Sequence, residues 1–247
     1  MTASAVTTGK LAGERLAGRI ALVTGASRGI GAAIARAYAK EGAELILTAR
    51  TTGGLEELDD EIRSISGRTS LLVPFDLKDF DAIDRLGAAL YERFGKLDVL
   101  VGNAGILGTL SPLGHISPKE FQEVIDINLT ANWRLLRSLD PLLRQSDAGR
   151  AIFLTSGAAR GPRAYWGTYA ISKAALEMMV GIYAQEIQQT KVRANMIDPG
   201  RTRTRMRAKA YPGEDPQSLK SPDEIMDKFI ELATAAFNGN GDVVKAQ

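Results

Sequence analysis

Short apolar runs and longer amphipathic segments alternate along the chain. Runs rich in valine, isoleucine and leucine predict β-strands at residues 19–24, 44–48, 70–74, 97–101, 151–155 and 192–197. In between, apolar residues recur at helical spacing, which predicts helices at residues 31–41, 55–64, 80–94, 118–136 and 169–188. The strand runs are almost continuously apolar, so we expect them to be buried on both faces. Strands that alternate with helices predict a doubly wound α/β fold, in which helices cover both faces of a parallel sheet.

One domain accounts for this pattern. The 247 residues suit a single α/β domain over residues 16–247, and the chain contains neither an internal repeat nor a low-complexity linker. Residues 1–15 are small and polar, and we expect a flexible N-terminus there. In doubly wound sheets, ligands bind at the carboxyl ends of the strands, where the strand order reverses. Side chains that follow the strands are therefore the candidates for chemistry.

Composition removes several classes of function. Hydrophobic residues make up 45% of the chain and charged residues 24%, as in an average globular protein. The formal net charge is +2, too small to indicate binding to nucleic acid or to a membrane surface. With no cysteine and one histidine, thiol chemistry, disulfides and histidine-rich metal clusters are excluded, and we expect no metal site. The N-terminus lacks a signal-peptide pattern and no apolar run is long enough to span a membrane, so we expect a cytoplasmic protein.

A glycine-rich segment follows the first predicted strand and opens the first predicted helix. It reads Thr-Gly-Ala-Ser-Arg-Gly-Ile-Gly over residues 24–31. Glycine allows a tight turn and lets backbone N–H groups approach a pyrophosphate, which then lies at the positive N-terminus of a helix. The position indicates a dinucleotide site, with contacts expected from Gly25, Ser27, Arg28, Gly29, Ile30 and Gly31. A glycine-rich turn that binds no ligand is the alternative.

The end of the second predicted strand indicates which dinucleotide binds. An acidic residue there would bind the ribose 2′-hydroxyl of NAD. Residues 47–51 read Leu-Thr-Ala-Arg-Thr and contain no acid. Arg50 offers a fork of N–H donors to a 2′-phosphate, and Arg28 can assist it. We therefore expect NADP as the cofactor in preference to NAD. The alternative is that both arginines are solvated, or that one of them contacts the pyrophosphate.

Two further strand ends carry residues suited to a flat cofactor. Asp76 and Leu77 follow the third predicted strand, and the Asp76 carboxylate can accept a hydrogen bond from an adenine amino group or cap the next helix. Asn103, Ala104 and Gly105 follow the fourth strand, where small residues let a cofactor lie against the backbone. An Asn-Ala-Gly sequence is equally typical of a turn.

Tyr169 and Lys173 lie one helical turn apart at the start of the last predicted helix. A lysine ammonium beside a phenol favours the phenolate, so we expect Lys173 to lower the pKa of Tyr169 from its ordinary value of about 10. A tyrosine tuned in this way can donate or accept a proton during catalysis. Ser156 ends the fifth predicted strand, where its hydroxyl can hold a substrate oxygen. We do not expect Ser156 to be a nucleophile, because no Ser-His-Asp pattern surrounds the single histidine, His115.

In their order and spacing, these motifs resemble the short-chain dehydrogenase/reductase family over residues 18–205. The resemblance implies a Rossmann-type domain that binds a dinucleotide and carries the catalytic residues. It implies that Tyr169 is the general acid for carbonyl reduction and the general base for alcohol oxidation. Lys173 would bind the nicotinamide ribose and lower the pKa of Tyr169, and Ser156 would hold the substrate oxygen.

Other residues match the family pattern as well. Asn128 corresponds to an asparagine that positions a water connecting Lys173 to solvent. The plainer alternative is an asparagine that bonds to backbone within its helix. By the same resemblance, the nicotinamide is bordered by Pro199, Gly200 and Thr204.

The resemblance implies an NAD(P)(H)-dependent oxidoreductase that transfers a hydride between nicotinamide and a small carbonyl or alcohol substrate, with NADPH favoured. The cofactor carries the hydride, and the protein supplies orientation and a proton. The alternative is a catalytically silent dinucleotide-binding sensor or scaffold of the same fold. Family members of that kind often lack the tyrosine or the lysine, whereas this sequence has both. An enoyl reductase is disfavoured because its tyrosine and lysine are typically spaced more widely.

Beyond the Pro-Gly pair the chain departs from the family pattern. Residues 201–207 carry arginines at alternate positions, which in an extended chain share one face and attract an anionic substrate. A solvated or interface-pairing basic strip is the alternative. We expect a mobile lid here, and residues 208–222 resemble the lid of a bacterial subgroup of oxidoreductases. The side chains expected to line the substrate pocket are those of Arg160, Arg163, Tyr165 and Trp166.

The C-terminal segment bears on subunit assembly. Residues 238–244 replace the longer final strand that many family members use in subunit contacts. We expect a homodimer or a homotetramer. The short last strand disfavours the tetramer, whereas the helices at 118–136 and 169–188 can form a dimer interface.

Overall fold

The predicted apolar runs form one parallel sheet in the computed structural model, which describes residues 14–247. The strands lie in the order β3-β2-β1-β4-β5-β6-β7, and every neighbouring pair is parallel. Their bounds are β1 Ile20–Thr24, β2 Glu44–Ala49, β3 Leu71–Pro74, β4 Val99–Gly102, β5 Arg150–Leu154, β6 Arg193–Asp198 and β7 Val243–Lys245. The predicted doubly wound parallel sheet is confirmed. Of the flexible N-terminus predicted for residues 1–15, residues 1–13 lie outside the described residues.

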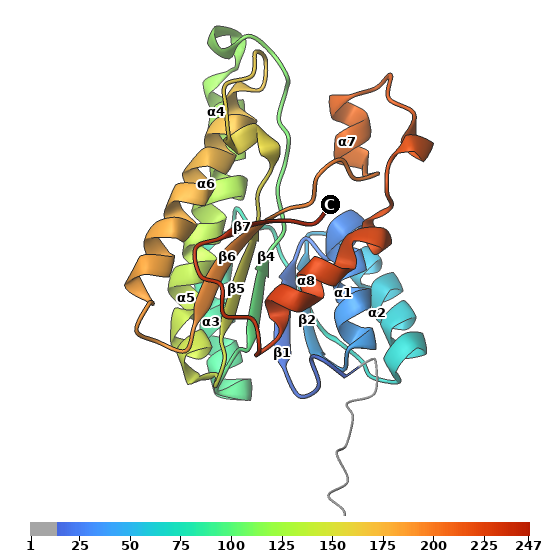
Figure 1. The fold of residues 1–247 in the computed structure, drawn as a ribbon, viewed down its shortest axis with the longest axis vertical. Coiled ribbons are helices and arrows are strands. Elements are labelled where there is room, and N and C mark those ends of the chain that lie inside the picture. The colour runs from blue at the N-terminus through green and yellow to red at the C-terminus, as the bar shows by residue number, and fades with distance from the viewer. Residues whose placement is uncertain (1–13) are drawn as a thin grey trace, which may run out of the picture.

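Helices cover both faces of the sheet (Figure 1). Their bounds are α1 Gly29–Lys40, α2 Thr52–Ser66, α3 Phe80–Phe94, α4 Pro118–Ile125, α5 Ala131–Gln145, α6 Gly167–Glu186, α7 Arg205–Ala210 and α8 Met226–Ala233. One layer holds α1, α2 and α8, and the other holds α3, α5 and α6. The short helices α4 and α7 lie beyond the carboxyl ends of the strands (Figure 1). Each layer encloses its own apolar core because the central strands are buried on both faces.

The segment predicted as a helix over residues 118–136 is longer and less regular than expected. α4 passes into a π-helical turn, Asp126–Thr130, and then into α5. The predicted end at residue 136 is wrong because Leu139 and Leu143 continue the buried face of the helix. Their burial outweighs the backbone hydrogen bond that Pro141, inside α5, cannot donate.

The strand order reverses between β1 and β4, which are adjacent in the sheet. The chain leaves β1 towards the layer that holds α1, and leaves β4 towards the layer that holds α5. Loops that diverge in this way leave a crevice at the carboxyl edge of the sheet. The residues that follow the strands are therefore placed around one site.

No helix within residues 14–247 is both long enough and apolar enough to cross a membrane. In the same part of the chain, no group of three or more histidine, aspartate or glutamate side chains is placed to hold a metal ion.

The close packing of α3 on α5 depends on Gly87. A Cβ atom on Gly87 would lie 2.0 Å from the Ser138 hydroxyl oxygen and 2.8 Å from the Ser138 carbonyl oxygen. Gly87→Ala is therefore expected to destabilise the fold by about 1–3 kcal/mol, even though alanine favours helices. Gly53→Ala in α2 is the matched control, since nothing lies within 4 Å of a Cβ at that position. Urea denaturation measures the free energy of unfolding of both variants. Equal values would contradict the proposed clash between a side chain at position 87 and Ser138.

Candidate active site

A single threonine connects the ends of β1 and β4. The Thr24 hydroxyl oxygen accepts hydrogen bonds from the backbone N–H groups of Asn103 (3.0 Å) and Ala104 (3.1 Å). Its O–H group lies 3.2 Å from the Val101 carbonyl oxygen, to which it donates. The Asn103 side chain donates in turn to the carbonyl oxygens of Thr24 (2.7 Å) and Gly25 (3.3 Å). The glycine loop and the Asn-Ala-Gly segment therefore meet where the strand order reverses.

In the glycine loop, the backbone comes too close to itself for side chains. Gly25 and Gly29 have φ angles of 64° and 59°, in the left-handed region that favours glycine. A Cβ atom on Gly31 would lie 2.3 Å from the Gly25 carbonyl oxygen and 2.6 Å from the Asn103 side-chain nitrogen. Arg28 precedes α1 without capping it through its side chain, and the first turn contains no acidic residue. The positive end of α1 therefore offers backbone N–H groups, which fits the pyrophosphate of a dinucleotide.

The rim of this loop carries the two arginines expected at the 2′-phosphate. Arg28 and Arg50 are exposed, the first beside the start of α1 and the second directly after β2. Ser27 is half-buried next to Arg28, and Ile30 packs against the core beneath. A guanidinium nitrogen of Arg50 lies 4.0 Å from a carboxylate oxygen of Asp76, an exposed ion pair that contributes little to stability. Both guanidinium groups can therefore turn to an anionic ligand.

Asp76 does not cap the next helix, which is one of its two expected roles. Asp79 caps α3 instead, by accepting a hydrogen bond from the backbone N–H of Ala82 (2.9 Å). The Asp76 carboxylate accepts from the backbone N–H of Lys78 (3.0 Å) within its own turn. Leu77 packs against the apolar core between the sheet and the layer of α3, α5 and α6. The role of Asp76 at an adenine ring stays a prediction.

Asn128, in the π-helical turn, links the loop after β4 to α6. Its side-chain oxygen accepts from the backbone N–H of Ile106 (2.8 Å), and its side-chain nitrogen donates to the Ile106 carbonyl oxygen (2.9 Å) and the Ser172 hydroxyl (3.0 Å). A Cβ atom on Gly105 would lie 3.2 Å from the Asn128 side-chain oxygen and 3.7 Å from the Lys173 nitrogen. The Asn128 side chain thus fixes the loop against α6, and the water implied beside Lys173 stays a prediction.

The structure brings Tyr169, Lys173 and Ser156 together at the carboxyl edge of β5. Tyr169 and Lys173 are buried, and the ammonium nitrogen lies 6.0 Å from the centroid of the phenol ring. Lys173 donates a hydrogen bond to the Leu154 carbonyl oxygen at the end of β5 (2.7 Å). The Ser156 hydroxyl accepts from the backbone N–H of Ala158 (3.2 Å) and faces the Tyr169 phenol. A proton donor, a second hydroxyl and a cation therefore share one buried site.

The electrostatics of this group differ from the sequence-based expectation. Burial raises the pKa of Tyr169; a hydrogen bond with Ser156 opposes this increase, and the negative charge of Asp198 adds to it. Burial also lowers the pKa of Lys173 to about 8, against the attraction of Glu177. For the protein alone, the prediction that Lys173 lowers the pKa of Tyr169 is wrong. The reason is that both side chains are withdrawn from water and the ammonium bonds to a backbone carbonyl.

Pro199 and Gly200 form a turn directly after β6. Gly200 has a φ angle of 69°, and its N–H donates to the Asp198 carboxylate (3.0 Å). The Pro199 carbonyl oxygen accepts from the Thr202 hydroxyl (2.9 Å) and from the Gln247 side chain (2.8 Å). This turn is held from both sides, and it borders the same edge of the sheet as Tyr169.

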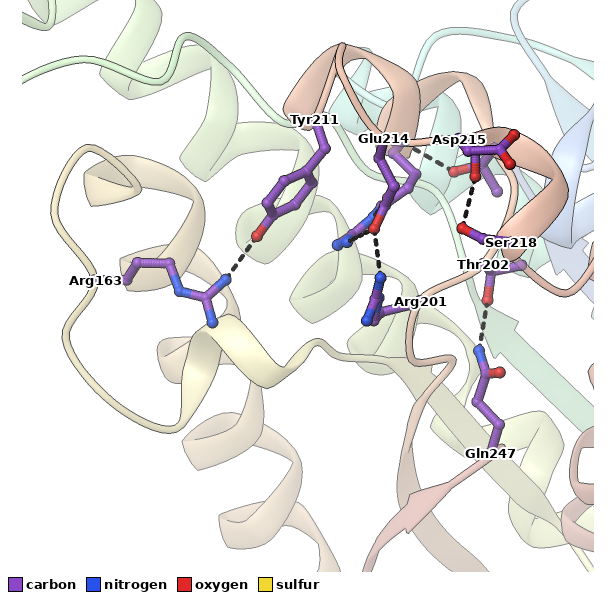
Figure 2. A network of polar contacts seen from close by, with 10 residues as sticks. Arg163, Arg201, Thr202, Tyr211, Glu214, Asp215, Ser218 and Gln247 are labelled. Atoms are coloured by element: carbon purple, nitrogen blue, oxygen red, sulfur yellow. Dashed lines mark hydrogen bonds and ion pairs between the residues drawn. The ribbon is translucent and has the colours of Figure 1, made fainter.

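Residues 201–222 fold over this edge and are called the lid below (Figure 2). Thr204 caps α7 by accepting a hydrogen bond from the backbone N–H of Arg207 (3.1 Å). Because a helix begins here, the alternate arginines do not share one face of an extended chain, and that expectation is wrong. Glu214 pairs with two of them, Arg201 at 2.7 Å and Arg207 at 2.5 Å. The single negative charge of Glu214 is therefore shared by two of the four arginines, and the lid keeps a net positive charge.

Aromatic side chains of the lid and of the loop after β5 enclose Tyr169. The Trp166 ring lies edge-on to the Tyr169 ring, with centroids 5.9 Å apart, and the Tyr211 ring of the lid packs on Trp166 at 5.7 Å. Arg163 donates to the Tyr211 hydroxyl at 2.9 Å (Figure 2). The Arg163 guanidinium also lies over the Trp166 ring. The apolar neighbours of this group are Leu107, Leu110, Met206 and Ala210.

Two residues expected to line the pocket point elsewhere. Tyr165 is 61% exposed and has a φ angle of 72°, which is uncommon for a residue other than glycine. Its carbonyl oxygen accepts from the backbone N–H of Ser111 (3.0 Å). Arg160 pairs with the carboxylates of Glu177 and Asp198. Sequence reasoning missed these two carboxylates, because a single acid in a helix or at a strand end belongs to no recognisable motif.

Comparison with known proteins agrees with this geometry. The model of the short chain dehydrogenase family matches residues 19–215. YciK, an oxidoreductase of Escherichia coli, is 41% identical over 216 residues, which cover 87% of this chain and 85% of YciK. A short chain dehydrogenase of Shigella flexneri complexed with NADP has a TM-score of 0.92 at 39% identity, over 95% of this chain and 99% of that one. One from Escherichia coli CFT073 complexed with NADPH has a TM-score of 0.92 at 39% identity, over 95% and 98%. This chain belongs to the short-chain dehydrogenase/reductase family of oxidoreductases.

Proposed function

We propose that the protein reduces carbonyl compounds with NADPH and oxidises the corresponding alcohols in reverse. The observation that carries the proposal is the buried Tyr169, which lies between the Ser156 hydroxyl and the Lys173 ammonium. Burying an ammonium costs folding free energy, and such costs are concentrated at functional sites. A silent dinucleotide-binding sensor or scaffold has no use for this pair of side chains.

The proposed cofactor is NADP(H), with NAD less favoured. Residues 25–31 would hold the pyrophosphate at the N-terminus of α1, and Arg28 and Arg50 would bind the 2′-phosphate. Residues 103–105 and the Pro-Gly turn at 199–200 would border the nicotinamide. The two solved structures named above, complexed with NADP and with NADPH, support this choice. Bound NADPH supplies the hydride that reduces the carbonyl carbon.

The chain's own residues handle the proton. The raised pKa of Tyr169 keeps the phenol protonated at neutral pH, as a general acid requires. The hydroxyls of Tyr169 and Ser156 donate to the substrate oxygen as negative charge develops on it. The ammonium of Lys173, which lies 6.0 Å from the centroid of the phenol ring, would bind the nicotinamide ribose and so hold the cofactor beside Tyr169. In the oxidative direction Tyr169 accepts the proton.

The walls of the site support an apolar substrate. Trp166 packs edge-on against the phenol and Tyr211 packs on Trp166, and leucine and methionine side chains surround them. Arg201 and Arg207 are engaged by Glu214 within the lid, so neither guanidinium group is free to serve an anionic substrate alone. We propose a small ketone or aldehyde with an aromatic or aliphatic body.

Exposed apolar side chains on α5 and α6 support a homodimer. Trp133, Ile171, Met178 and Ile182 are exposed on these helices. Gathered apolar surface is typical of subunit interfaces. We propose that two copies associate through α5 and α6, while the three residues of β7 offer little further surface. The cytoplasmic location expected from the sequence stays a prediction.

Tyr169→Phe is expected to remove turnover and to preserve the packing of the ring. Loss of the proton donor should lower kcat/KM by about 100-fold or more. The measurement is NADPH oxidation with a panel of aromatic and aliphatic carbonyls. Tyr165→Phe, at an exposed neighbouring position, is the matched control and should keep wild-type rates. Equal, non-zero rates for Tyr169→Phe and wild type would refute the assignment of the acid.

Arg50→Asp is expected to weaken NADPH binding far more than NADH binding. An aspartate at this position repels a 2′-phosphate but accepts a hydrogen bond from a ribose hydroxyl. The Kd for NADPH should rise about tenfold or more, which corresponds to about 1.4 kcal/mol. Isothermal titration calorimetry with each dinucleotide measures the Kd. Lys119→Asp on α4 is the control, because this position is exposed and the substitution changes the charge by the same amount. The 2′-phosphate assignment fails if both dinucleotides lose affinity equally.

Lys173→Met is expected to stabilise the protein at neutral pH while destroying activity. The pKa of Lys173 is about 8 in the fold, against 10.5 for a lysine in water, so burial of the charged form opposes folding below pH 8. This penalty shrinks as the pH rises from the folded to the unfolded pKa. The gain from methionine should therefore be about 1–3 kcal/mol near pH 7 and close to zero near about pH 10.5.

Urea unfolding of the protein without dinucleotide at the two pH values checks this. Lys119→Met, at an exposed position, is the control and should show no such dependence on pH. A gain that is the same at both pH values would mean that better packing, and not the buried charge, accounts for it.

A further inference from the structure

Two carboxylates lie beside the Tyr169–Lys173 pair and share one arginine. Arg160 contacts a carboxylate oxygen of Glu177 at 2.8 Å through one guanidinium nitrogen and the Asp198 carboxylate through another. The side chains of Glu177 and Asp198 are only 17% and 12% exposed, whereas that of Arg160 is 35% exposed. Thr155 adds a hydrogen bond to Glu177 at 2.6 Å. The arginine therefore reaches from the surface inward to two largely buried acids.

Each acid is placed next to one member of the pair. Glu177 lies one helical turn beyond Lys173 on α6, and its negative charge raises the pKa of that lysine against the effect of burial. Asp198 ends β6, and a Cβ atom on Gly157, which follows Ser156, would lie 3.7 Å from one of its carboxylate oxygens. Its negative charge disfavours the Tyr169 phenolate. Neither acid is required for the proton transfer itself.

Few other charged side chains lie close to Tyr169 and Lys173. Tyr169 is faced by Lys173 from its own helix, by Ser156 from the chain after β5, and by Asp198 from β6, which Arg160 contacts in turn. The loop after β4 and the lid contribute the apolar side chains Leu107, Leu110 and Met206 to its surroundings. Within this set, Arg160 contacts both acids at once.

We propose that Arg160 is a positioning residue of the active site: its guanidinium holds the carboxylates of Glu177 and Asp198 in place, away from the Lys173 ammonium and the Tyr169 phenol. Without it, Glu177 is free to pair with Lys173, since side chains one turn apart on a helix are neighbours. The ammonium is then drawn from the Leu154 carbonyl oxygen, to which it is bonded at 2.7 Å. A planar guanidinium suits this task because it donates to two carboxylates in fixed directions. The proposal rests on the catalytic roles of Tyr169 and Lys173 proposed above.

The test follows Lys173 directly, in the full-length protein without dinucleotide. Lysine side chains labelled with carbon-13 are titrated by NMR, and Lys173→Met identifies the signal of interest. Arg160→Met is expected to raise the pKa of Lys173 by about one unit, because the released carboxylate of Glu177 pairs with the ammonium. Adding Glu177→Gln to that variant should bring the pKa back to the wild-type value or below it.

A merely structural role for Arg160 gives a different result. Loss of packing would not be reversed by Glu177→Gln, so an unreversed shift, or no shift at all, overturns the proposal. Arg160→Gln, which keeps a polar but shorter and uncharged side chain, should give the same shift as Arg160→Met and serves if the latter does not fold. Arg163→Met, which removes a nearby arginine that contacts neither acid, is the matched control and should leave the titration unchanged.

A second readout concerns Tyr169 and Asp198. The ultraviolet absorbance of tyrosinate is titrated for each protein and for its Tyr169→Phe counterpart, so that the difference reports Tyr169 alone. Arg160→Met should move the ionisation of Tyr169 to higher pH, and Asp198→Asn should reverse this while still accepting from the Gly200 N–H. A shift that Asp198→Asn leaves in place contradicts the proposal. Neither titration requires turnover, so failure of this proposal is distinguishable from failure of the proposed function, which would appear as equal, non-zero rates for Tyr169→Phe and wild type.

Discussion

Where the strand order reverses, the loops after β1 and β4 leave the sheet in different directions, and the Thr24 hydroxyl holds them together. The rest of the site depends on this contact. From the loop after β4, hydrogen bonds pass to Asn128, from Asn128 to the Ser172 hydroxyl, and from Ser172 to the Tyr169 carbonyl oxygen (2.8 Å). The loop suited to a pyrophosphate and the helix that carries Tyr169 are therefore parts of one polar framework. A networked arrangement of this kind holds reacting groups in position more firmly than isolated contacts do.

One face of α6 shows how such a framework coexists with a stable fold. Tyr169, Lys173 and Glu177 follow one another at successive turns, so a polar stripe with a buried ammonium points into the protein. Between and beyond them, Leu176, Val180 and other buried apolar residues of the same helix pack in the core that α6 shares with α5. Burial of these apolar side chains offsets the cost of burying the polar ones. The buried polar residues lie in the first half of α6, and beyond Glu177 the buried residues are mainly apolar.

Much of this arrangement could be predicted from sequence because it is local. Strands buried on both faces are continuous apolar runs, and the motifs follow strand ends, so their order along the chain places them at one edge. The remainder depends on contacts between distant segments. The pairing of Glu214 with two of the four lid arginines is visible only in the fold. The pKa of Tyr169 depends on burial, which an i, i+4 spacing does not report. The short elements α7, α8 and β7 contain too few turns or residues to show a period.

The glycine loop contains two kinds of position. At Gly31 no side chain fits, because the backbone and Asn103 already fill the space. Arg28 and Arg50, at the rim, are exposed, and neither side chain belongs to the core. Substitution at the first kind of position disturbs the fold itself, whereas substitution at the second leaves the core intact. If Arg28 and Arg50 bind the 2′-phosphate as proposed, the preference for one dinucleotide over the other can change through surface residues alone, without any change to the backbone framework of the loop.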